Sequence, residues 1–137
     1  MSSIHSAAIH LLRRVREVDG EMGITPARAS ALSVLVFGGP CTLTRLARAE
    51  QVTTATMSRL VAAMEAEGLV RREPDALDGR AALLHPTAKA RRILERGRAR
   101  REGVLEELFA SLSVRDRGTV DRAAAIIEGC LAASSAS

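Results

Sequence analysis

The feature that most constrains the fold is a change of hydrophobic spacing at Gly68. Upstream, four large apolar residues recur at the spacing of one helix face, namely Met57, Leu60, Val61 and Met64. Gly68 stands where helices commonly end on a left-handed residue. Downstream, residues 69–73 and 81–85 have the composition of two short strands, and the polar, turn-rich stretch 74–80 lies between them. The sequence therefore predicts a helix that leads directly into a strand-loop-strand.

The opposite face of this predicted helix consists of small side chains around one arginine. The helical wheel places Arg59 at the middle of that face and surrounds it with alanines and hydroxyl side chains: Ala55, Ala62, Ala66, Thr54, Thr56, Ser58 and Ala63. Hydroxyls and a lone arginine are poor material for a core. Alanines keep the helix slim enough for close approach. The face is therefore interpreted as a surface that another molecule touches closely.

Helical periodicity and capping residues predict three helices before this one. The first is expected to run to about Asp19–Gly20. Thr25-Pro26 reads as the N-cap and first residue of the second helix, which Gly38-Gly39-Pro40 ends. Thr42 is expected to cap a short third helix, and residues 50–52 form the turn that follows it.

Two more helices are predicted after the strands. A long, heavily charged helix runs from about Thr87 to Ser111, and its apolar end is marked by Leu105, Leu108, Phe109 and Leu112. A last helix begins at about Val114 and carries Val120, Ala124, Ile127 and Leu131. The first helix and these terminal segments hold more apolar surface than a three-helix core with a small wing can cover. Either they pair with a second copy of the chain, or they fold back on their own domain.

Two short helices, a tight turn and a strand-loop-strand together make a mainly α winged helix-turn-helix. In this arrangement the second helix of the pair enters the DNA major groove, and the hairpin reaches the backbone or the neighbouring minor groove. The residues predicted to face DNA are Thr54, Thr56, Ser58, Arg59 and Ala62 on the helix and Arg71, Arg72 and Arg80 in the wing. The alternative is a winged helix used for protein–protein contact, in which exposed large apolar or acidic residues would replace Arg59 and the hydroxyls.

The charge balance suits a polyanionic partner. Twenty Lys+Arg against sixteen Asp+Glu give a net charge of +4, and the sequence pI is about 10.3. Every basic residue except Lys89 is an arginine, and arginine forks match phosphate oxygens and guanine edges better than lysine does. A solvated arginine-rich surface would give the same balance, so charge by itself does not identify DNA.

Length and composition predict one folded domain in a reducing compartment. The chain has 137 residues, of which 47% are hydrophobic, so it is long enough to bury a core. No apolar run approaches the ~18 residues of a membrane span, and the N-terminus lacks the pattern of a signal peptide. Cys41 and Cys130 do not form a disulfide framework. We therefore expect a cytoplasmic protein without a membrane partner.

No arrangement of residues in the sequence predicts catalysis, a cofactor or a metal. There is no Gly-rich phosphate loop and no nucleophile paired with a base, so no enzymatic activity is expected. His5, His10 and His85 are interpreted as surface or satisfied histidines, because no Cys/His pair has ligand spacing. Cys41, beside a helix start, is considered as a redox-active thiolate, although the interpretation as an inert thiol is preferred. Cys130 is interpreted as a small core residue.

The chain resembles the MarR family of bacterial transcriptional regulators over nearly its whole length. The order of elements matches, and the residues that carry the resemblance are Thr25-Pro26, Thr56–Val61, Glu67–Val70, Asp75, Asp78, Arg80 and Thr87. In the wing signature, Asp75 and Asp78 are expected to stabilise the loop and help position Arg80. The chain departs from the family pattern at Gln51, Pro86 and Ala90, which replace a turn glycine, an apolar strand residue and a frequent glycine.

The resemblance implies a homodimeric repressor that responds to a ligand. The DNA-binding lobe would span about 25–86, and the helical dimerisation region would span about 1–20 and 87–137 of the single chain. Two recognition helices would enter successive major grooves of a pseudo-palindromic site, with the wings reaching flanking DNA through Arg80. A small effector, often aromatic or phenolic in the family, would bind between the dimer region and the lobe and alter the spacing of the helices.

Overall fold

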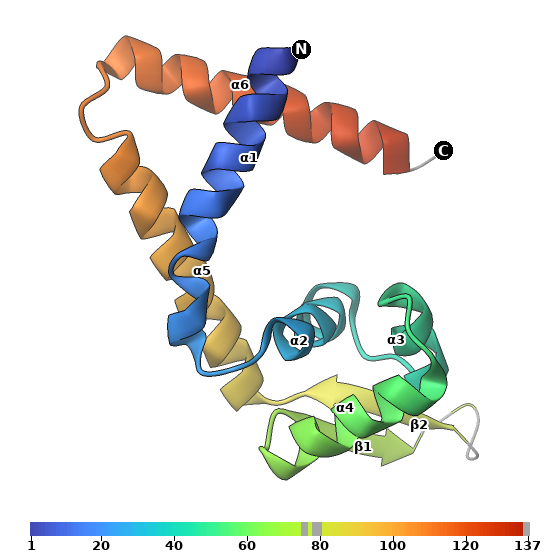
Figure 1. Cartoon of the computed structure of the whole chain (residues 1–137). Coiled ribbons are helices and arrows are strands. Elements are labelled where there is room, and N and C mark those ends of the chain that lie inside the picture. Colours follow the sequence, from blue (N-terminus) through green and yellow to red (C-terminus); the bar gives the residue numbers. More distant parts are fainter. Residues whose placement is uncertain (75–76, 78–80, 136–137) are drawn as a thin grey trace. The chain divides into compact units, whose positions relative to one another are not determined.

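The computed structural model describes residues 1–74, 77 and 81–135 (Figure 1). In chain order the elements are α1 (Ser2–Arg16), the 3-10 turn η1 (Asp19–Met22), α2 (Pro26–Gly38), α3 (Leu43–Ala49), α4 (Thr54–Ala66), β1 (Val70–Pro74), β2 (Ala82–Pro86), α5 (Ala88–Leu108) and α6 (Val114–Ser135). The chain forms two compact units, 1–101 and 102–137. The prediction of a mainly helical fold with a two-stranded wing is confirmed.

Threonine side chains cap the N-terminal ends of α2, α3 and α4. Thr25 accepts a hydrogen bond from the backbone N–H of Arg28, and Thr42 accepts one from that of Arg45, each at 3.3 Å. Thr53 does the same for α4. Each hydroxyl satisfies one of the backbone donors that a helix start leaves unpaired. The first two caps confirm the sequence prediction, whereas the cap at Thr53 was not identified from the sequence.

The core lies where α2, α3 and α4 meet the strands and the first turns of α5. Its buried residues are Ala31, Leu32, Leu35, Cys41, Leu46, Ala47, Met57, Val61, Met64, Leu69, Val70, Leu84, Ala90 and Leu94. Met57, Val61 and Met64 belong to the apolar face that periodicity had predicted for α4. Ala90 is fully buried, so the lobe accommodates a methyl group where a glycine is frequent in the family.

The wing is an antiparallel pair in which Val70 lies opposite Pro86 and Pro74 opposite Ala82. Each strand begins and ends one residue later than predicted. At β1 the cause is Leu69, whose N–H donates to the carbonyl oxygen of Met64 at 2.8 Å and so closes the preceding helix. Pro86 forms the buried end of β2, so the second strand includes the proline that departs from the family pattern.

Two predicted helix ends also differ from the structure. The first helix was expected to reach Asp19–Gly20, but α1 ends at Arg16 and a separate 3-10 turn follows. The N–H of Glu17 bonds to the carbonyl oxygen of Arg14, three residues back, which tightens the last turn. The long helix was expected to end at Ser111, but α5 stops at Leu108.

The prediction that Cys130 is a core residue is wrong, because Cys130 is exposed. The described side chains of α6 from 121 to 134 are all exposed, so this unit has no core of its own around the cysteine. Along the described part of the chain, no helix combines the length and apolarity that a bilayer crossing requires.

Candidate nucleic-acid interface

The exposed face of α4 is the one that the helical wheel predicted. Met57, Val61 and Met64 are buried, and Leu60 is partly buried. The predicted DNA-facing residues of the helix are all exposed: Thr54, Thr56, Ser58, Arg59 and Ala62. Within the described residues, the Arg59 guanidinium has neither an ion pair nor a hydrogen bond to another side chain. The helix therefore presents an uncommitted cation among small side chains.

The first turn of α4 has its hydroxyls fixed by one another. The Thr53 hydroxyl accepts from the backbone N–H of Thr56 at 3.1 Å and donates to the Thr56 hydroxyl oxygen at 3.0 Å. The Thr56 hydroxyl keeps its own proton available for a further acceptor. Sequence reasoning missed Thr53 as a member of this surface. The signal was present, since a threonine immediately before an amphipathic helix is a strong N-cap candidate.

The turn between α3 and α4 sets the direction in which α4 leaves the helix pair. Gln51 has φ +57°, the left-handed conformation for which the family usually employs glycine. The N–H of Val52 then donates to the carbonyl oxygen of Ala47 at 3.0 Å. Glu50 is held to α2 because the Ser30 hydroxyl lies 2.9 and 2.8 Å from its two carboxylate oxygens. The turn is thus anchored on both sides.

The two described wing arginines are already engaged by carboxylates. Arg71 forms an ion pair with Glu73 on the same strand. Arg72 Nε donates to Glu65 of α4 at 2.7 Å, which ties β1 to the end of the helix. Both guanidinium groups remain substantially exposed. The third predicted wing residue, Arg80, lies outside the described residues, as do Asp75 and Asp78.

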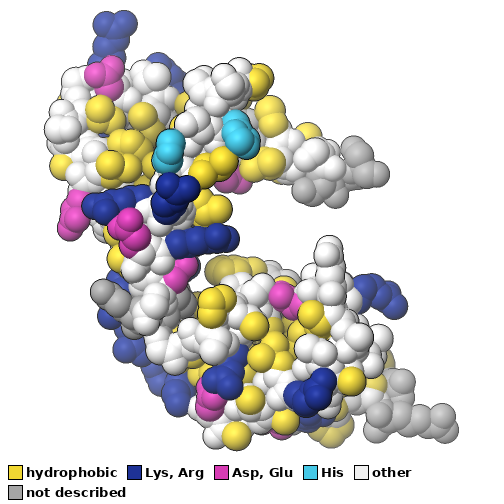
Figure 2. Space-filling model, in the orientation of Figure 1, with side chains coloured by type: hydrophobic (Ala, Val, Ile, Leu, Met, Phe, Trp, Pro, Cys, Tyr) yellow, Lys and Arg dark blue, Asp and Glu magenta, His cyan; other side chains and the backbone are white. Residues whose placement is uncertain are grey.

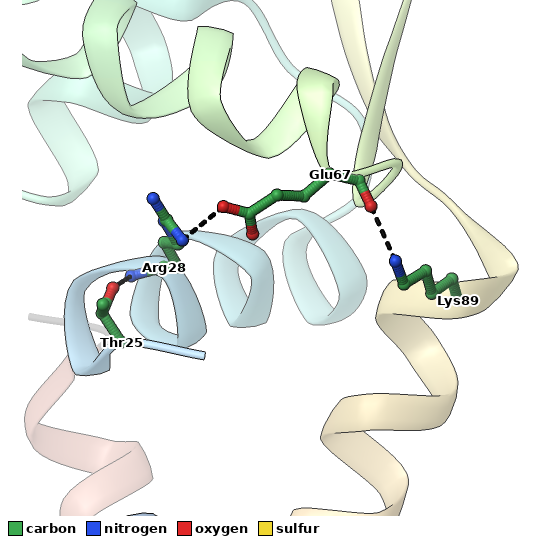
Figure 3. Close-up of polar contacts among 4 residues, drawn as sticks. All are labelled: Thr25, Arg28, Glu67 and Lys89. Atoms are coloured by element: carbon green, nitrogen blue, oxygen red, sulfur yellow. Dashed lines mark hydrogen bonds and ion pairs between the residues drawn. The ribbon is translucent and has the colours of Figure 1, made fainter. Parts of the chain in front are cut away.

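The C-terminal end of α4 is held by residues from α2 and α5 (Figure 3). Gly68 has φ +73°, as predicted, and completes the helix end. The Arg28 guanidinium lies 2.5 Å from the Glu67 carboxylate, and Lys89 Nζ donates to the Glu67 carbonyl oxygen at 2.8 Å. The Thr87 hydroxyl donates to the Gly68 carbonyl oxygen at 2.6 Å. Sequence reasoning did not identify these contacts, because they join distant segments.

A second cationic surface that the sequence reasoning missed lies on α3. Arg45 and Arg48 are exposed and lie three residues apart, on the side of the helix away from buried Leu46 and Ala47. With three neighbours they line a surface hollow of about 600 Å³, whose described lining residues are Thr42, Thr44, Arg45, Arg48 and Ala49. The available signal was their spacing, which places both side chains on one helix face.

Two other hollows adjoin α2. One, of about 590 Å³, is lined by Arg16, Asp19, Gly20, Ile24, Pro26, Ala29 and Arg101. At its wall, Arg101 donates to the Asp19 carboxylate at 3.0 Å. The other is a groove of about 370 Å³ beside α4, and its lining includes Arg28, Glu50, Thr56 and Arg59. The first hollow combines apolar walls with charges of both signs, and the second adjoins the exposed face of α4.

The cysteine and histidine residues show no reactive or metal-binding arrangement in the described parts of the chain. Burial raises the pKa of the Cys41 thiol, and the nearby charge of Arg45 offsets this only in part. His5 and His10 are exposed. His85 Nε2 is buried without a hydrogen-bond partner, although a Glu73 carboxylate oxygen lies 3.2 Å away. Among the described residues, no group of three His, Cys, Asp or Glu side chains is placed to hold a metal.

A capped helix pair, a left-handed turn, an exposed cationic second helix and a paired strand hairpin define a winged helix-turn-helix protein of the DNA-binding type. The sequence model of the MarR family matches residues 22–81, the segment that contains these elements. In this segment the chain is similar to the MarR family of winged helix-turn-helix transcriptional regulators, and its fold is MarR-like. Its function is therefore regulatory and not enzymatic, as the sequence predicted.

Similarity to known proteins extends beyond the matched segment. The HTH-type transcriptional regulator ML2140 of Mycobacterium leprae is 29% identical over 126 residues, which cover 92% of this chain and 88% of that protein. The crystal structure of transcriptional regulator Tm0710 from Thermotoga maritima has a TM-score of 0.85 and 26% identity, covering 99% and 96% of the two chains. A mutant of Staphylococcus aureus MepR, solved bound to an oligodeoxyribonucleotide, has a TM-score of 0.72 and 19% identity, covering 95% and 96%.

Proposed function

We propose that the protein is a homodimeric, ligand-responsive repressor that recognises a specific double-stranded DNA site through the exposed face of α4. Arg59 would contact a base edge, and Thr54, Thr56, Ser58 and Ala62 would surround it. Arg71, Arg72 and Arg80 would reach phosphates from the wing, the first two with less free charge because carboxylates already engage them. The protein would act in the cytoplasm, on the chromosome of a bacterium.

The observation that carries DNA recognition is the uncommitted guanidinium of Arg59 on a face of hydroxyls and methyl groups. An exposed arginine fork is suited to the O6 and N7 atoms of guanine. Small neighbours let the helix enter a groove about 12 Å wide without obstruction. Arg45 and Arg48 extend the cationic surface onto α3, the helix that crosses the backbone in this architecture. The oligodeoxyribonucleotide bound by the similar MepR mutant supports the same assignment.

Homodimerisation is supported by the apolar surface that the terminal helices expose. In α1 the exposed residues are Ile4, Ile9 and Leu12, and in and around α6 they are Val114, Ile126, Ile127 and Leu131. Figure 2 shows apolar side chains on the surface of the molecule. Such exposure is typical of a chain that buries these faces against a partner. A two-fold dimer would place two copies of α4 on neighbouring half-sites.

A ligand response is supported by the hollow of about 590 Å³ at the junction of α1, η1 and α2. Ile24, Pro26 and Ala29 give it an apolar wall, and Arg16 contributes a cation at its rim. A small molecule that binds there more tightly in one conformation would shift the population of DNA-competent dimers. Repression would follow when the bound dimer obstructs polymerase at a promoter.

Footprinting on the DNA that flanks the protein's own gene tests the proposal. We expect protection of a pseudo-palindromic site and an affinity that falls steeply with salt, because phosphate contacts release counterions. Equal affinity for the flanking DNA and for shuffled sequence would refute specific recognition. The alternative function, a winged helix that binds only protein, predicts that neither DNA nor heparin retains the chain at low salt.

A further inference from the structure

The C-terminal end of α4 carries two carboxylates, Glu65 and Glu67, and arginines from outside the helix engage both. Arg72 of β1 contacts Glu65, and Arg28 of α2 contacts Glu67. Negative side chains at the C-terminal end of a helix oppose the helix dipole. They would also repel the phosphates of DNA bound to the same helix. The two arginines remove both effects at the end of the helix proposed to read bases.

The contact at Glu67 differs from the other because two helices hold the same residue. Its carboxylate meets the Arg28 guanidinium at 2.5 Å, and the exposed fractions of the side chains are 39% for Glu67 and 26% for Arg28. Its main-chain carbonyl accepts from Lys89 of α5 at 2.8 Å. Arg28 is itself fixed, because its backbone N–H donates to the Thr25 cap. Figure 3 shows this chain of contacts from the first turn of α2 to the start of α5.

Fixing the end of α4 limits its tilt, which the core contacts control less directly. Met57, Val61 and Met64 hold one face of the helix, but Glu67 lies beyond the last of them. Arg59 lies eight residues before Glu67, a distance of about 12 Å along a helix. A tilt of about 5° at the anchored end would move Arg59 by about 1 Å, enough to spoil a base-edge hydrogen bond.

We propose that Arg28 is a positioning residue: its ion pair with Glu67 sets the orientation of α4 and thereby the discrimination between a specific DNA site and other sequences. This inference rests on the proposed recognition of DNA by α4. Arg28 acts through Glu67 and does not read bases itself. Phosphate binding by Arg45, Arg48 and the wing is unaffected by the pair, so affinity for random DNA depends on it only weakly.

The test measures binding to two duplexes of equal length by fluorescence anisotropy at one salt concentration. One duplex is selected from a random pool by the unmodified protein, and the other is its shuffled sequence. We expect Arg28→Glu to weaken binding of the selected duplex about tenfold more than that of the shuffled one, because attraction to Glu67 becomes repulsion. Arg28→Lys keeps the charge, so its ratio of affinities for the selected and shuffled duplexes should stay within about threefold of the wild-type ratio.

Two further variants separate positioning from general charge. Arg91→Glu, on the exposed side of α5, makes the same change in net charge and should weaken both duplexes alike. The double variant Arg28→Glu with Glu67→Arg restores an ion pair of opposite sense and should recover most of the lost discrimination. Thermal unfolding of each variant shows whether it is folded, and the double variant keeps the test decisive if Arg28→Glu alone does not fold.

Three outcomes would overturn the inference. Equal losses on both duplexes that exceed those of Arg91→Glu would make Arg28 a direct phosphate contact. An Arg28→Glu variant whose losses on both duplexes match those of Arg91→Glu would show that the core alone orients α4. A folded double variant that fails to regain discrimination would show that the pair with Glu67 is not what matters. Failure of the proposed function is distinguishable, because the unmodified protein would then select no duplex.

Discussion

At the scale of single residues, the polar groups of the lobe divide into those already paired and those left free. Arg28, Arg71 and Arg72 each meet a carboxylate, whereas Arg59 meets none among the described side chains. A free guanidinium can turn toward a new acceptor without breaking an existing contact, whereas a paired one must first lose its carboxylate partner. Arg59 is therefore the residue from which we expect the largest effect on DNA binding.

Arg59→Ala should weaken binding to the specific site by about 1–3 kcal/mol per half-site, the usual contribution of a bidentate arginine–guanine contact. Random DNA should lose much less. Stability should change by no more than about 0.5 kcal/mol, because the side chain is exposed on the helix. Anisotropy titrations and urea unfolding measure the two quantities. Ser58→Ala should cost less, and an equal loss on all sequences would make Arg59 a phosphate contact.

Cys41 provides a prediction about pH. Burial raises the pKa of its thiol, so the unfolded chain loses this proton at lower pH than the folded protein does. The thiol's contribution to stability is therefore complete below its unfolded pKa of about 8.5 and declines as pH rises above it. Urea unfolding should show that the stability difference between wild type and Cys41→Ala shrinks from pH 7 to pH 10.

The same burial should make Cys41 inert to oxidants. In a Cys130→Ser background, peroxide should leave DNA binding unchanged, as should replacement of Cys41 by serine. A peroxide response that disappears in the Cys41→Ser variant would assign Cys41 a redox role against this expectation.

At the scale of elements, the turn between α3 and α4 stores strain in one residue. Gln51 has φ +57°, which costs a residue with a Cβ about 1–2 kcal/mol. Glycine avoids that cost but loses about 0.5–1 kcal/mol through the greater freedom of the unfolded chain. Gln51→Gly should therefore stabilise the protein by about 0.5–1 kcal/mol. Urea unfolding checks this, with Gln51→Ala as the control that keeps the strain and gives no gain.

The hollow on α3 gives a second prediction for an element. If Arg48 reaches a phosphate, Arg48→Ala should weaken binding to all DNA sequences by a similar factor. The slope of log Kd against log salt should fall by about 1 per protomer. Arg122→Ala, an exposed arginine of α6, is the matched control and should leave the slope unchanged.

Local signals made most elements predictable from the sequence. Thr25 and Thr42 begin their helices, and the buried side of α4 follows its apolar spacing, because caps and periodicity depend on neighbouring residues. The pairs Arg28–Glu67 and Arg72–Glu65 were not predictable, since they form only when separate segments meet. For the same reason the sequence could propose Arg71 and Arg72 as phosphate contacts but could not show that carboxylates already engage them.

At the scale of the whole molecule, the terminal helices raise the question of what covers them. Cys130 was assigned to a core on periodicity alone, yet it is exposed with the described side chains around it. Periodicity identifies an apolar face but does not say which chain buries it. The exposed apolar residues of α6 therefore fit the proposal that a second copy supplies the missing surface.

The intact protein should therefore behave as a dimer of twice 14.6 kDa in light scattering. Ile127→Glu should shift it toward monomer, because a charge buried in an interface without a partner is strongly unfavourable. Glu128→Gln, at the neighbouring exposed position, is the control and should remain dimeric. Removal of residues 114–137 should give a monomer or an insoluble chain. A well-folded monomer of the intact protein would remove the basis for paired half-sites, and with it the proposed mechanism.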